Sequence, residues 1–377
     1  MKALVIDGGR NGLAVVRALA AAGIEPHLGS PLPRQVTRFS RDVAGTWRLP
    51  DPVDTDRFVA AVAAVGGALA DHDGLPLLLP VNDIYVIALG RAWSRLAATF
   101  RAGFLTDQDR LARLLEKDRC YALAREVGVP VPPEAPSAGA YLAAGIPFPA
   151  VVKPALRNSP EFRSAPPFRV RVCAGAAELR AACDELLRIG AVPVIQRFIP
   201  GGDDALYTAG VAALDGRILA TFTGRKLRQF PPLLGEASYA ESLAAPGTAA
   251  HAERLLAHAG FTGIAQVEFK RSEGTDYLME VNPRSWSWIG LAGACGVNLP
   301  AALARAVLGR PVPPALQRNG ATWMYSLQDA RYHLRPRGSV GWGTWFRQAV
   351  TAETHAHWSL RDPLPALAQI LPRLGLG

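Results

Sequence analysis

The 377-residue sequence contains no uninterrupted apolar run close to the ~20 residues that a membrane-spanning helix needs. The nearest case, residues 58–70, is short, and charged residues bracket it on both sides. We therefore expect a buried or half-buried helix there and no membrane span. The N-terminus also lacks the pattern of a secretion signal, because charged residues interrupt its short apolar stretch.

Cysteine is scarce, with only Cys120, Cys173, Cys183 and Cys295 in the whole chain. The four residues form no CxxC pair and no Cys/His spacing typical of a metal site. We interpret them as reduced, mostly structural thiols, which suits a cytoplasmic protein.

The chain has fewer acidic than basic residues, with 32 Asp and Glu against 41 Lys and Arg, and its net charge is +9. A nucleic-acid surface would gather its basic residues together with aromatics. Here arginine is spread along the whole chain, so we expect no nucleic-acid partner. We interpret the excess partly as background composition and partly as a pocket for a polyanion such as ATP. With 49% hydrophobic and 19% charged residues, the composition is that of a globular protein of two or three packed units.

The first 30 residues predict a strand, a turn, a helix and a second strand. An apolar strand at 3–6 precedes a Gly-rich turn at 7–12, and an Ala-rich helix at 13–22 leads to a strand that begins at Glu25. This order is the βαβ opening of a parallel sheet. The turn does not match GxGxxG and no acidic residue follows the second strand, so we do not expect nicotinamide or flavin binding.

Polar residues follow the strands of this predicted sheet. Asp7, Arg10 and Asn11 come after the first strand, and Asn82 and Asp83 come after an apolar strand at 75–81. Open α/β sheets bind ligands at the carboxyl ends of their strands, so these residues are candidates for one rim of a site. For Asp83, an N-cap of the helix predicted at 84–96 is an equal alternative.

The pattern changes after residue 105, and we divide the chain into units at 1–104, 105–310 and 311–377. In the middle unit we expect strands and helices that alternate irregularly. The predicted strands are 150–154, 170–173, 192–199, 206–214, 217–224, 264–271 and 277–281, and the helices are 107–128, 176–189 and 299–308. The last unit is rich in Trp, Pro and Arg. It is expected to be a peripheral cover, with an amphipathic membrane-surface segment as the alternative.

Two neighbouring predicted strands carry the strongest chemical signal. Glu268 lies on one strand and Glu280 on the next, with a turn at Gly274 between them, so antiparallel pairing would place both on one face. Like carboxylates held side by side repel, and a divalent cation gives a reason for their proximity. With the amide oxygen of Asn282 they form a hard-oxygen site of the kind Mg²⁺ prefers. Arg284 follows directly, and exposed sheet glutamates are the competing interpretation.

Several cations precede and flank this acidic pair. Lys153 ends an apolar strand, where an unpaired lysine is costly, so a bound phosphate is a suitable partner. Lys117 lies one element upstream, and Lys226 follows the strand 217–224. Taken singly, each cation is more often a solvated surface charge.

A third element is the apolar strand at 194–199, which runs into Pro200 and Gly201. It suits a hinge whose backbone groups read an adenine edge. Asp203 or Asp204, just after it, is a candidate for the ribose hydroxyls.

Over about residues 105–310 the sequence resembles the ATP-grasp superfamily. The resemblance lies in the order of its motifs, which are Lys117, Val151-Val152-Lys153-Pro154, Gln196 to Gly201, Glu268 and Glu280-Val281-Asn282-Pro283-Arg284. The N-terminal sheet resembles the Rossmann-like domain that usually precedes it. The resemblance implies an α/β fold whose nucleotide-binding part is α+β. The best likeness is to carboxylate–amine ligases such as D-aspartate ligase, on the motifs at 9–12, 223–231 and 362–365.

The resemblance implies roles for particular residues. Lys117 and Lys153 would contact the phosphates of ATP. Gln196, Arg197 and Ile199 would contact the adenine, and Asp203 would contact the ribose. For two Mg²⁺ ions, with Mn²⁺ as an alternative, the ligands would be Glu268, Glu280 and Asn282. For the γ-phosphate and the acyl phosphate, the catalytic residues would be Lys226 and Arg284. The substrates would be a small carboxylate and an amine, and we expect one of them to be an amino acid. Related folds are often dimers, so the resemblance also allows a homodimer.

The sequence departs from the family at two places. The loop that covers the phosphates is usually Gly/Ser-rich, whereas residues 156–167 are rich in Pro and Arg. The hinge position that often carries Glu holds Gln196 or Arg197. An ATP-grasp kinase or carboxylase-type enzyme and a non-catalytic nucleotide-binding protein are the alternatives. The intact set of lysines, acids and Arg284 argues against the latter.

Overall fold

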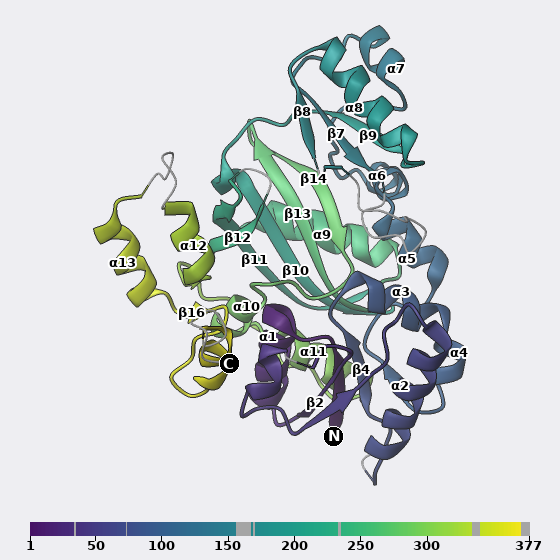
Figure 1. Cartoon of the computed structure of the whole chain (residues 1–377), viewed down its shortest axis with the longest axis vertical. Coiled ribbons are helices and arrows are strands. Elements are labelled where there is room, and N and C mark those ends of the chain that lie inside the picture. The colour runs from purple at the N-terminus through teal and green to yellow at the C-terminus, as the bar shows by residue number, and fades with distance from the viewer. Residues whose placement is uncertain are drawn as a thin grey trace.

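Three β-sheets stacked along the long axis of the molecule organise the part of the chain that the structure describes (Figure 1). The structure is a computed structural model that describes residues 1–33, 35–72, 74–155, 167–168, 170–232, 235–333 and 340–370. In Figure 1 the N-terminal sheet lies at the bottom, the longest strands form the middle sheet, and a small sheet with its helices lies at the top.

The N-terminal sheet is parallel and has the strand order β3-β2-β1-β4-β5. Its strands are β1 (Lys2–Ile6), β2 (Glu25–Ser30), β3 (Gly45–Arg48), β4 (Leu77–Pro80) and β5 (Arg101–Ala102). The accompanying helices are α1 (Gly9–Ala20), η1 (Val36–Phe39), α2 (Thr55–Leu69), α3 (Asp83–Arg91) and α4 (Trp93–Leu96). The predicted parallel opening is confirmed, because β1 pairs in parallel with both β2 and β4.

Two predicted helices of this unit have different bounds in the structure. Helix α1 begins at Gly9 rather than at residue 13, because the turn is completed by Asp7 to Gly9, in which Asp7 and Gly9 take left-handed φ values of 80° and 69°. The helix predicted at 84–96 is two helices, since the backbone leaves the helical region at Ala92. Helix α2 confirms the buried helix expected near residues 58–70.

The small sheet has the order β6-β9-β7-β8 and its own hydrophobic core. It consists of β6 (Glu134–Ala135), β7 (Ala150–Pro154), β8 (Arg171–Cys173) and β9 (Pro193–Arg197), with helices α7 (Ala138–Ala143) and α8 (Ala176–Arg188) on it. Helices α5 (Gln108–Leu115) and α6 (Lys117–Glu126) lead into it. The helix predicted at 107–128 is divided at Glu116, whose backbone is extended.

The middle sheet has the order β14-β13-β10-β11-β12-β15-β16. Its strands are β10 (Leu206–Leu214), β11 (Arg217–Phe230), β12 (Glu236–Ser242), β13 (Gly263–Ser272), β14 (Thr275–Asn282), β15 (Thr322–Met324) and β16 (Thr354–His355). Its connections include η2 (Asp203–Ala205), α9 (Pro246–His258), α10 (Gly290–Ala294) and α11 (Leu299–Val307). Strand β11 continues six residues beyond the expected end at Gly224, so Lys226 lies within the strand and not after it.

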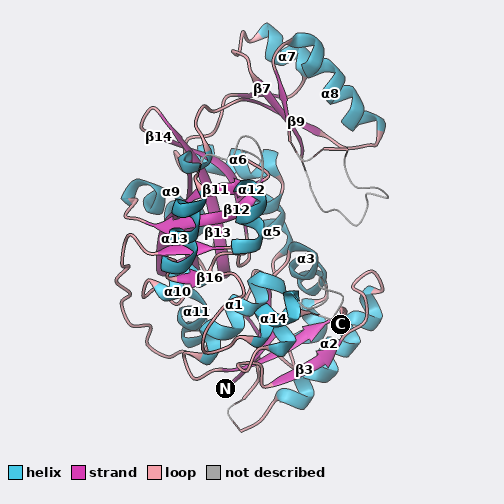
Figure 2. Cartoon of the chain, turned by 60° about the vertical axis from the view of Figure 1, so that its left-hand side comes forward, coloured by secondary structure: helices cyan, strands magenta, loops and turns pink. Residues whose placement is uncertain are grey.

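The C-terminal segment belongs to the middle sheet and is more than a cover. Strand β15 pairs with β12, and β16 pairs with β15. The remaining helices are α12 (Ser326–His333), α13 (Trp342–Thr351) and α14 (Leu364–Ile370). Figure 1 shows α12 and α13 at the edge of the molecule beside β12, and Figure 2 shows α14 close to the N-terminal sheet.

Two buried carboxylates fasten this segment to the rest of the chain. Asp362 accepts hydrogen bonds from Arg17 (2.9 Å), from Ser40 Oγ (2.6 Å) and from the backbone N–H of Arg41 (3.0 Å). Asp329, with a fully buried side chain, accepts bonds from Arg228 Nη2 at 2.7 Å. Further donors to Asp329 are Ser238 Oγ at 2.6 Å and Trp345 Nε1 at 2.8 Å.

No helix among the described residues is both long enough and apolar enough to cross a membrane. The four cysteines are free and buried, as expected for structural thiols.

The Asp329–Arg228 pair gives a test of how the C-terminal segment is held. We expect Asp329→Ala to lower the free energy of unfolding by about 3–5 kcal/mol, because it leaves the Arg228 charge buried without its partner. Urea unfolding followed by tryptophan fluorescence measures the loss. Asp56→Ala is the matched control, since the Asp56–Arg95 pair is solvent-exposed and exposed pairs contribute little. Equal effects of the two substitutions would contradict the assignment.

Candidate active site

A cavity of about 740 Å³ lies where the three sheets meet. The N-terminal sheet contributes the ends of β1 and β4, the small sheet contributes the end of β7, and β11, β13 and β14 supply the wall between them. Residues predicted from the sequence that line it are Lys117, Lys153, Lys226, Glu268, Glu280, Asn282 and Arg284. Seven residues spread over nearly 170 positions thus meet in one place.

The acidic pair lies on adjacent strands, as expected. Glu268 on β13 is the register partner of Glu280 on β14, and Gln266 is the partner of Asn282. Directly opposed residues of antiparallel strands share a face, so the two carboxylates lie on the same wall of the cavity. Gln266 Nε2 donates to Glu268 at 2.9 Å and Asn282 Nδ2 donates to Glu280 at 3.1 Å.

Burial raises the pKa of Glu268, Lys226 partly opposes that rise, and the neighbouring charge of Glu280 adds to it. The net pKa lies above the ordinary value because two carboxylates share a site with little access to water. Lys226 Nζ lies 2.9 Å from Glu268 Oε1 and so neutralises part of the acidic pair.

Lys153 is a buried lysine of β7 that lines the same cavity. Its Nζ donates to the hydroxyl of Tyr121 at 2.9 Å, and that hydroxyl donates to the carbonyl of Met279 at 2.7 Å. Burial and the nearby Lys117 lower the pKa of Lys153 to about 7, against the opposing effect of Glu280. Lys117 Nζ donates to the carbonyls of Pro154 and Ala155, both at 3.3 Å.

Arg284 connects the acidic strands to the N-terminal sheet. Its Nε lies 2.9 Å from Asp83 Oδ1, and its Nη2 donates to Asn282 Oδ1 at 3.1 Å. Asp83 is the first residue of α3, whereas Asn82 caps that helix. Of the two alternatives for Asp83, the structure therefore supports a place on the rim of the cavity.

The residues predicted for adenine and ribose lie outside the cavity lining. Gln196 and Arg197 belong to β9, which has neighbours on both sides, and the Arg197 N–H donates to the carbonyl of Pro133 at 2.8 Å. Ile199 is buried. The carboxylate of Asp203 accepts from the backbone N–H of Gln229 at 2.8 Å and from its Nε2 at 3.0 Å. Their contacts with a nucleotide stay predictions.

The loop expected to cover the phosphates lies mostly outside the described residues, which omit 156–166. Two cavity residues were missed because no local pattern marks them. Tyr121 lies in the middle of a helix, and Glu236, at the start of a strand that was not predicted, pairs with Arg10.

Trp286 and Trp288 line the cavity and are also buried among aromatic side chains. Their rings are perpendicular at 5.8 Å, and Phe222 packs against both. These two side chains therefore form part of the cavity wall and pack in the hydrophobic core at the same time.

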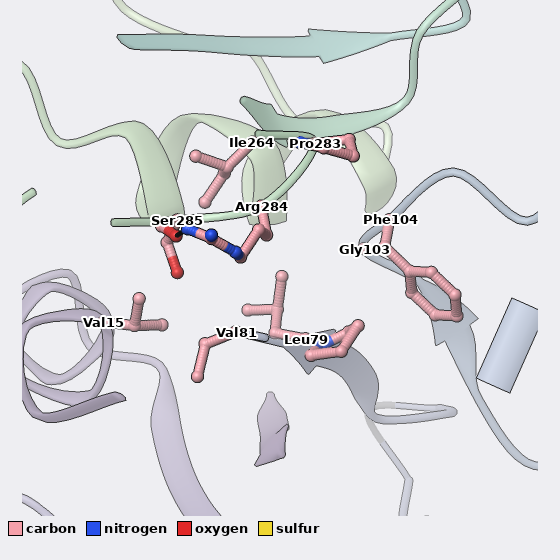
Figure 3. Close-up of a pocket in the computed structure, with 10 residues that line it drawn as sticks. Val15, Leu79, Val81, Gly103, Phe104, Ile264, Pro283, Arg284 and Ser285 are labelled. Atoms are coloured by element: carbon pink, nitrogen blue, oxygen red, sulfur yellow. Dashed lines mark hydrogen bonds between the residues drawn. The ribbon is translucent and has the colours of Figure 1, made fainter. Parts of the chain in front are cut away.

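A second, much smaller space of about 10 Å³ lies behind Arg284, between the middle and N-terminal sheets (Figure 3). In Figure 3, Arg284 and Ser285 lie across from Val15, Leu79 and Val81. The volume is enough for about one water molecule. It is too small for a substrate, so the chemistry belongs to the larger cavity.

The fold is similar to that of several solved enzymes. A biotin carboxylase from Campylobacter jejuni, solved as a β-γ-ATP complex, has a TM-score of 0.65 and 14% identity over 85% of this chain and 74% of its own. A second similar structure is the biotin carboxylase domain dimer of 2-oxoglutarate carboxylase from Hydrogenobacter thermophilus, in complex with MgADP and bicarbonate. Its TM-score is 0.64 and its sequence identity 16%, over 85% of this chain and 73% of its own. An L-amino acid ligase from Bacillus licheniformis has a TM-score of 0.60 and a sequence identity of 16%, over 85% of this chain and 78% of its own.

Sequence comparison adds a family match over part of the chain. Residues 211–326 match a family described as ATP-grasp in the biosynthetic pathway with Ter operon. No match was found among curated proteins. The matched range contains strands β11, β13 and β14 with Lys226, Glu268, Glu280, Asn282 and Arg284. The chain therefore has the ATP-grasp fold, and the range that matches the family model carries the acidic pair.

Proposed function

We propose that this protein is an ATP-dependent carboxylate–amine ligase, which forms an amide or peptide bond through an acyl phosphate and releases ADP and phosphate. The observation that carries the proposal is the single cavity in which buried lysines face an in-register pair of glutamates. Such a cavity holds a polyanion on one side and its metal ions on the other.

The cations are suited to the phosphates of ATP. Lys153 is buried with a hydroxyl as its closest partner, and a phosphate supplies the negative charge that a buried ammonium requires. Lys117 lies close enough to lower the Lys153 pKa, so the two together would hold the α- and β-phosphates. Gln196, Arg197 and Ile199 for adenine, and Asp203 for ribose, complete the proposed nucleotide contacts.

The donor set fits Mg²⁺. Glu268, Glu280 and Asn282 offer oxygen ligands, and burial, with a smaller contribution from the charge of Glu280, raises the pKa of Glu268. Among the described residues no group of three His, Cys, Asp or Glu residues forms a metal cluster. Two acids and an amide therefore suit ions that also bind phosphate oxygens, either Mg²⁺ or Mn²⁺, and we propose two of them.

The remaining cations are placed for the transfer itself. Lys226 contacts Glu268 and Arg284 contacts Asn282 in the cavity lining, where they would neutralise charge on the γ-phosphate and then on the acyl phosphate. The carboxylate oxygen would attack the γ-phosphorus and displace ADP. The amine would then attack the acyl carbon and displace phosphate. Positioning and charge neutralisation would supply most of the rate enhancement.

The experiment that tests the proposal is product analysis with Mg²⁺-ATP and pooled amino acids and small carboxylates. We expect ADP and phosphate release that needs both a carboxylate and an amine. Mass spectrometry should find a product lighter by one water than the sum of the two. A stable phosphorylated product would favour an ATP-grasp kinase, a carboxylated product would favour a carboxylase-type enzyme, and absent ATP binding would overturn the proposal.

Glu280→Ala tests the metal site. We expect turnover to fall at least 100-fold, about 2.7 kcal/mol of transition-state stabilisation, with an unchanged melting temperature. Glu241→Ala is the matched control, because Glu241 lies on β12 of the same sheet and pairs with Arg225, and neither residue lines the cavity. An active Glu280→Ala enzyme would remove the metal assignment.

Lys153 predicts proton uptake on nucleotide binding. With a pKa of about 7 it is largely neutral at pH 8, and the phosphates of bound ATP favour its charged form. Calorimetry of Mg²⁺-ATP binding in buffers of different ionisation enthalpy should therefore show uptake near one proton at pH 8 and less at pH 6. Lys153→Arg keeps the charge at every pH, so this variant should bind without that uptake. Equal uptake in both proteins would contradict the role of Lys153.

A further inference from the structure

Gln229 on β11 is a buried polar residue of the cavity lining to which the proposed chemistry gives no role. It is 2% exposed, and Lys226, three residues earlier, is 6% exposed. Gln229 Oε1 accepts from Lys226 Nζ at 3.4 Å, and Gln229 Nε2 donates to Asp203 Oδ1 at 3.0 Å. The side chain thus connects a proposed catalytic lysine to a carboxylate of η2, which lies between β9 of the small sheet and β10 of the middle sheet.

The two neighbours determine which end of the Gln229 amide faces each of them. A carboxylate accepts hydrogen bonds and an ammonium group donates them, so the flipped amide would set Nε2 against Lys226 and Oε1 against Asp203. The backbone N–H of Gln229 also donates to Asp203 Oδ2, at 2.8 Å. Asp203 therefore binds this residue twice and holds its amide oxygen toward Lys226.

A β-bulge puts Lys226 and Gln229 on the same side of the sheet. In an uninterrupted strand, side chains three positions apart point to opposite faces. The pairing of β11 with β12 shifts its register between Lys226 and Arg228, and again between Arg228 and Gln229. Bulges re-aim side chains in this way. As a result Lys226 and Gln229 both line the cavity, whereas Arg228 pairs with the buried Asp329 of α12.

The Lys226 ammonium group has three N–H donors and two acceptors in the protein. Glu268 Oε1 lies 2.9 Å from Lys226 Nζ, and Gln229 Oε1 lies 3.4 Å from it. Among the described residues no third acceptor bonds to this nitrogen. Two contacts fix the rotation of the ammonium group about its bond to the side chain. The third N–H therefore has one direction, and it is available to an anionic ligand in the cavity that Lys226 lines.

We propose that Gln229 is a positioning residue of the ligase, which fixes the Lys226 ammonium group so that its third N–H donates to the phosphoryl group under transfer. Without the amide oxygen, Lys226 keeps only Glu268 as a partner and turns about that contact. The bonds from Gln229 to Asp203 hold the amide in place for this task. The inference rests on the proposed function, in which Lys226 neutralises charge on the γ-phosphate.

Gln229→Met removes the amide and keeps the approximate length of the side chain. With the substrates found by product analysis, we expect kcat to fall about 10-fold or more, as for a lost hydrogen bond to a charged group. The KM for Mg²⁺-ATP should stay the same, because the backbone N–H of residue 229 still donates to Asp203. Steady-state kinetics measure both constants.

Nuclear magnetic resonance of the lysine ammonium groups tests the positioning without turnover. Labelling with ¹⁵N-lysine gives a small set of signals, because the chain has only five lysines, Lys2, Lys117, Lys153, Lys226 and Lys270. The loss of one signal in Lys226→Arg assigns it. We expect Gln229→Met to shift the Lys226 signal and to speed the exchange of its protons with water, because one of its two acceptors is gone.

Gln317→Met is the matched control for a lost glutamine on the same strand. Gln317 Oε1 accepts from the N–H of Thr223 on β11 at 2.7 Å, and its Nε2 donates to the Thr223 carbonyl at 2.8 Å. Neither bond involves Lys226. We therefore expect this variant to keep the wild-type kcat and the wild-type Lys226 signal, even where it lowers the melting temperature.

A double variant tests whether the contact can be rebuilt. Asp203→Asn combined with Gln229→Glu exchanges the amide and the carboxylate, so that the new amide donates to the new carboxylate and an oxygen still faces Lys226. We expect this pair to restore the Lys226 signal and to recover part of the kcat lost in Gln229→Met. Asp203→Asn alone favours the flipped Gln229 amide and should disturb the signal.

Each contrary result has a distinct meaning. An unchanged kcat or an unchanged Lys226 signal in Gln229→Met would overturn the inference while the ligase function stands. Equal losses in Gln317→Met would also overturn it, because Gln229 would then support the strand and not the lysine. A wild-type protein that forms no ligation product would remove the proposed function and this inference with it. The Lys226 signal distinguishes the two failures, since it reports the contact without any substrate.

Discussion

The register between β13 and β14 is the constraint on which the rest of the site depends. It places Glu268 opposite Glu280 within a buried wall, where two like charges repel. The surrounding residues compensate by contact. Lys226 pairs with Glu268, Asn282 donates to Glu280, and Arg284 donates to Asn282. A one-residue slip of β14 would send Glu280 to the other face, so the pairing determines whether the site exists.

The second constraint is that separate parts of the chain must meet at this wall. Arg284 reaches Asp83 of the N-terminal unit, which fixes the rim of the first sheet beside the acidic strands. On the other side, Asp329 of the C-terminal segment holds Arg228, two residues after Lys226 on β11. The segment from residue 311 onward thus bears directly on the strand that carries a proposed catalytic lysine.

The cavity contains a buried acid, Glu268, and a buried base, Lys153, and burial shifts the pKa of each. Burial raises the pKa of Glu268 and lowers that of Lys153, so each group is held against its charged form. A bound metal ion and a bound phosphate would relieve both at once. Under the proposed function, a charged nucleotide and its cations would supply the charges that these protein groups lack.

The sequence by itself determined the parallel N-terminal sheet, most strands of the middle region and the acidic pair, because alternation, turn residues and carboxylate spacing are local signals. It placed Glu268 and Glu280 on one face, since a tight turn at Gly274 dictates antiparallel pairing. The sequence analysis predicted that β11 ends at Gly224, because residues 225–229 are mostly polar and do not show the pattern of a buried strand. In the structure, β12 and the C-terminal segment cover these residues. Only the tertiary structure decided that Tyr121 would meet Lys153, that Asp83 would hold Arg284, and that Asn11 would donate to the carbonyl of Ser285. Those contacts join residues far apart in the chain, and no local pattern encodes which of them meet.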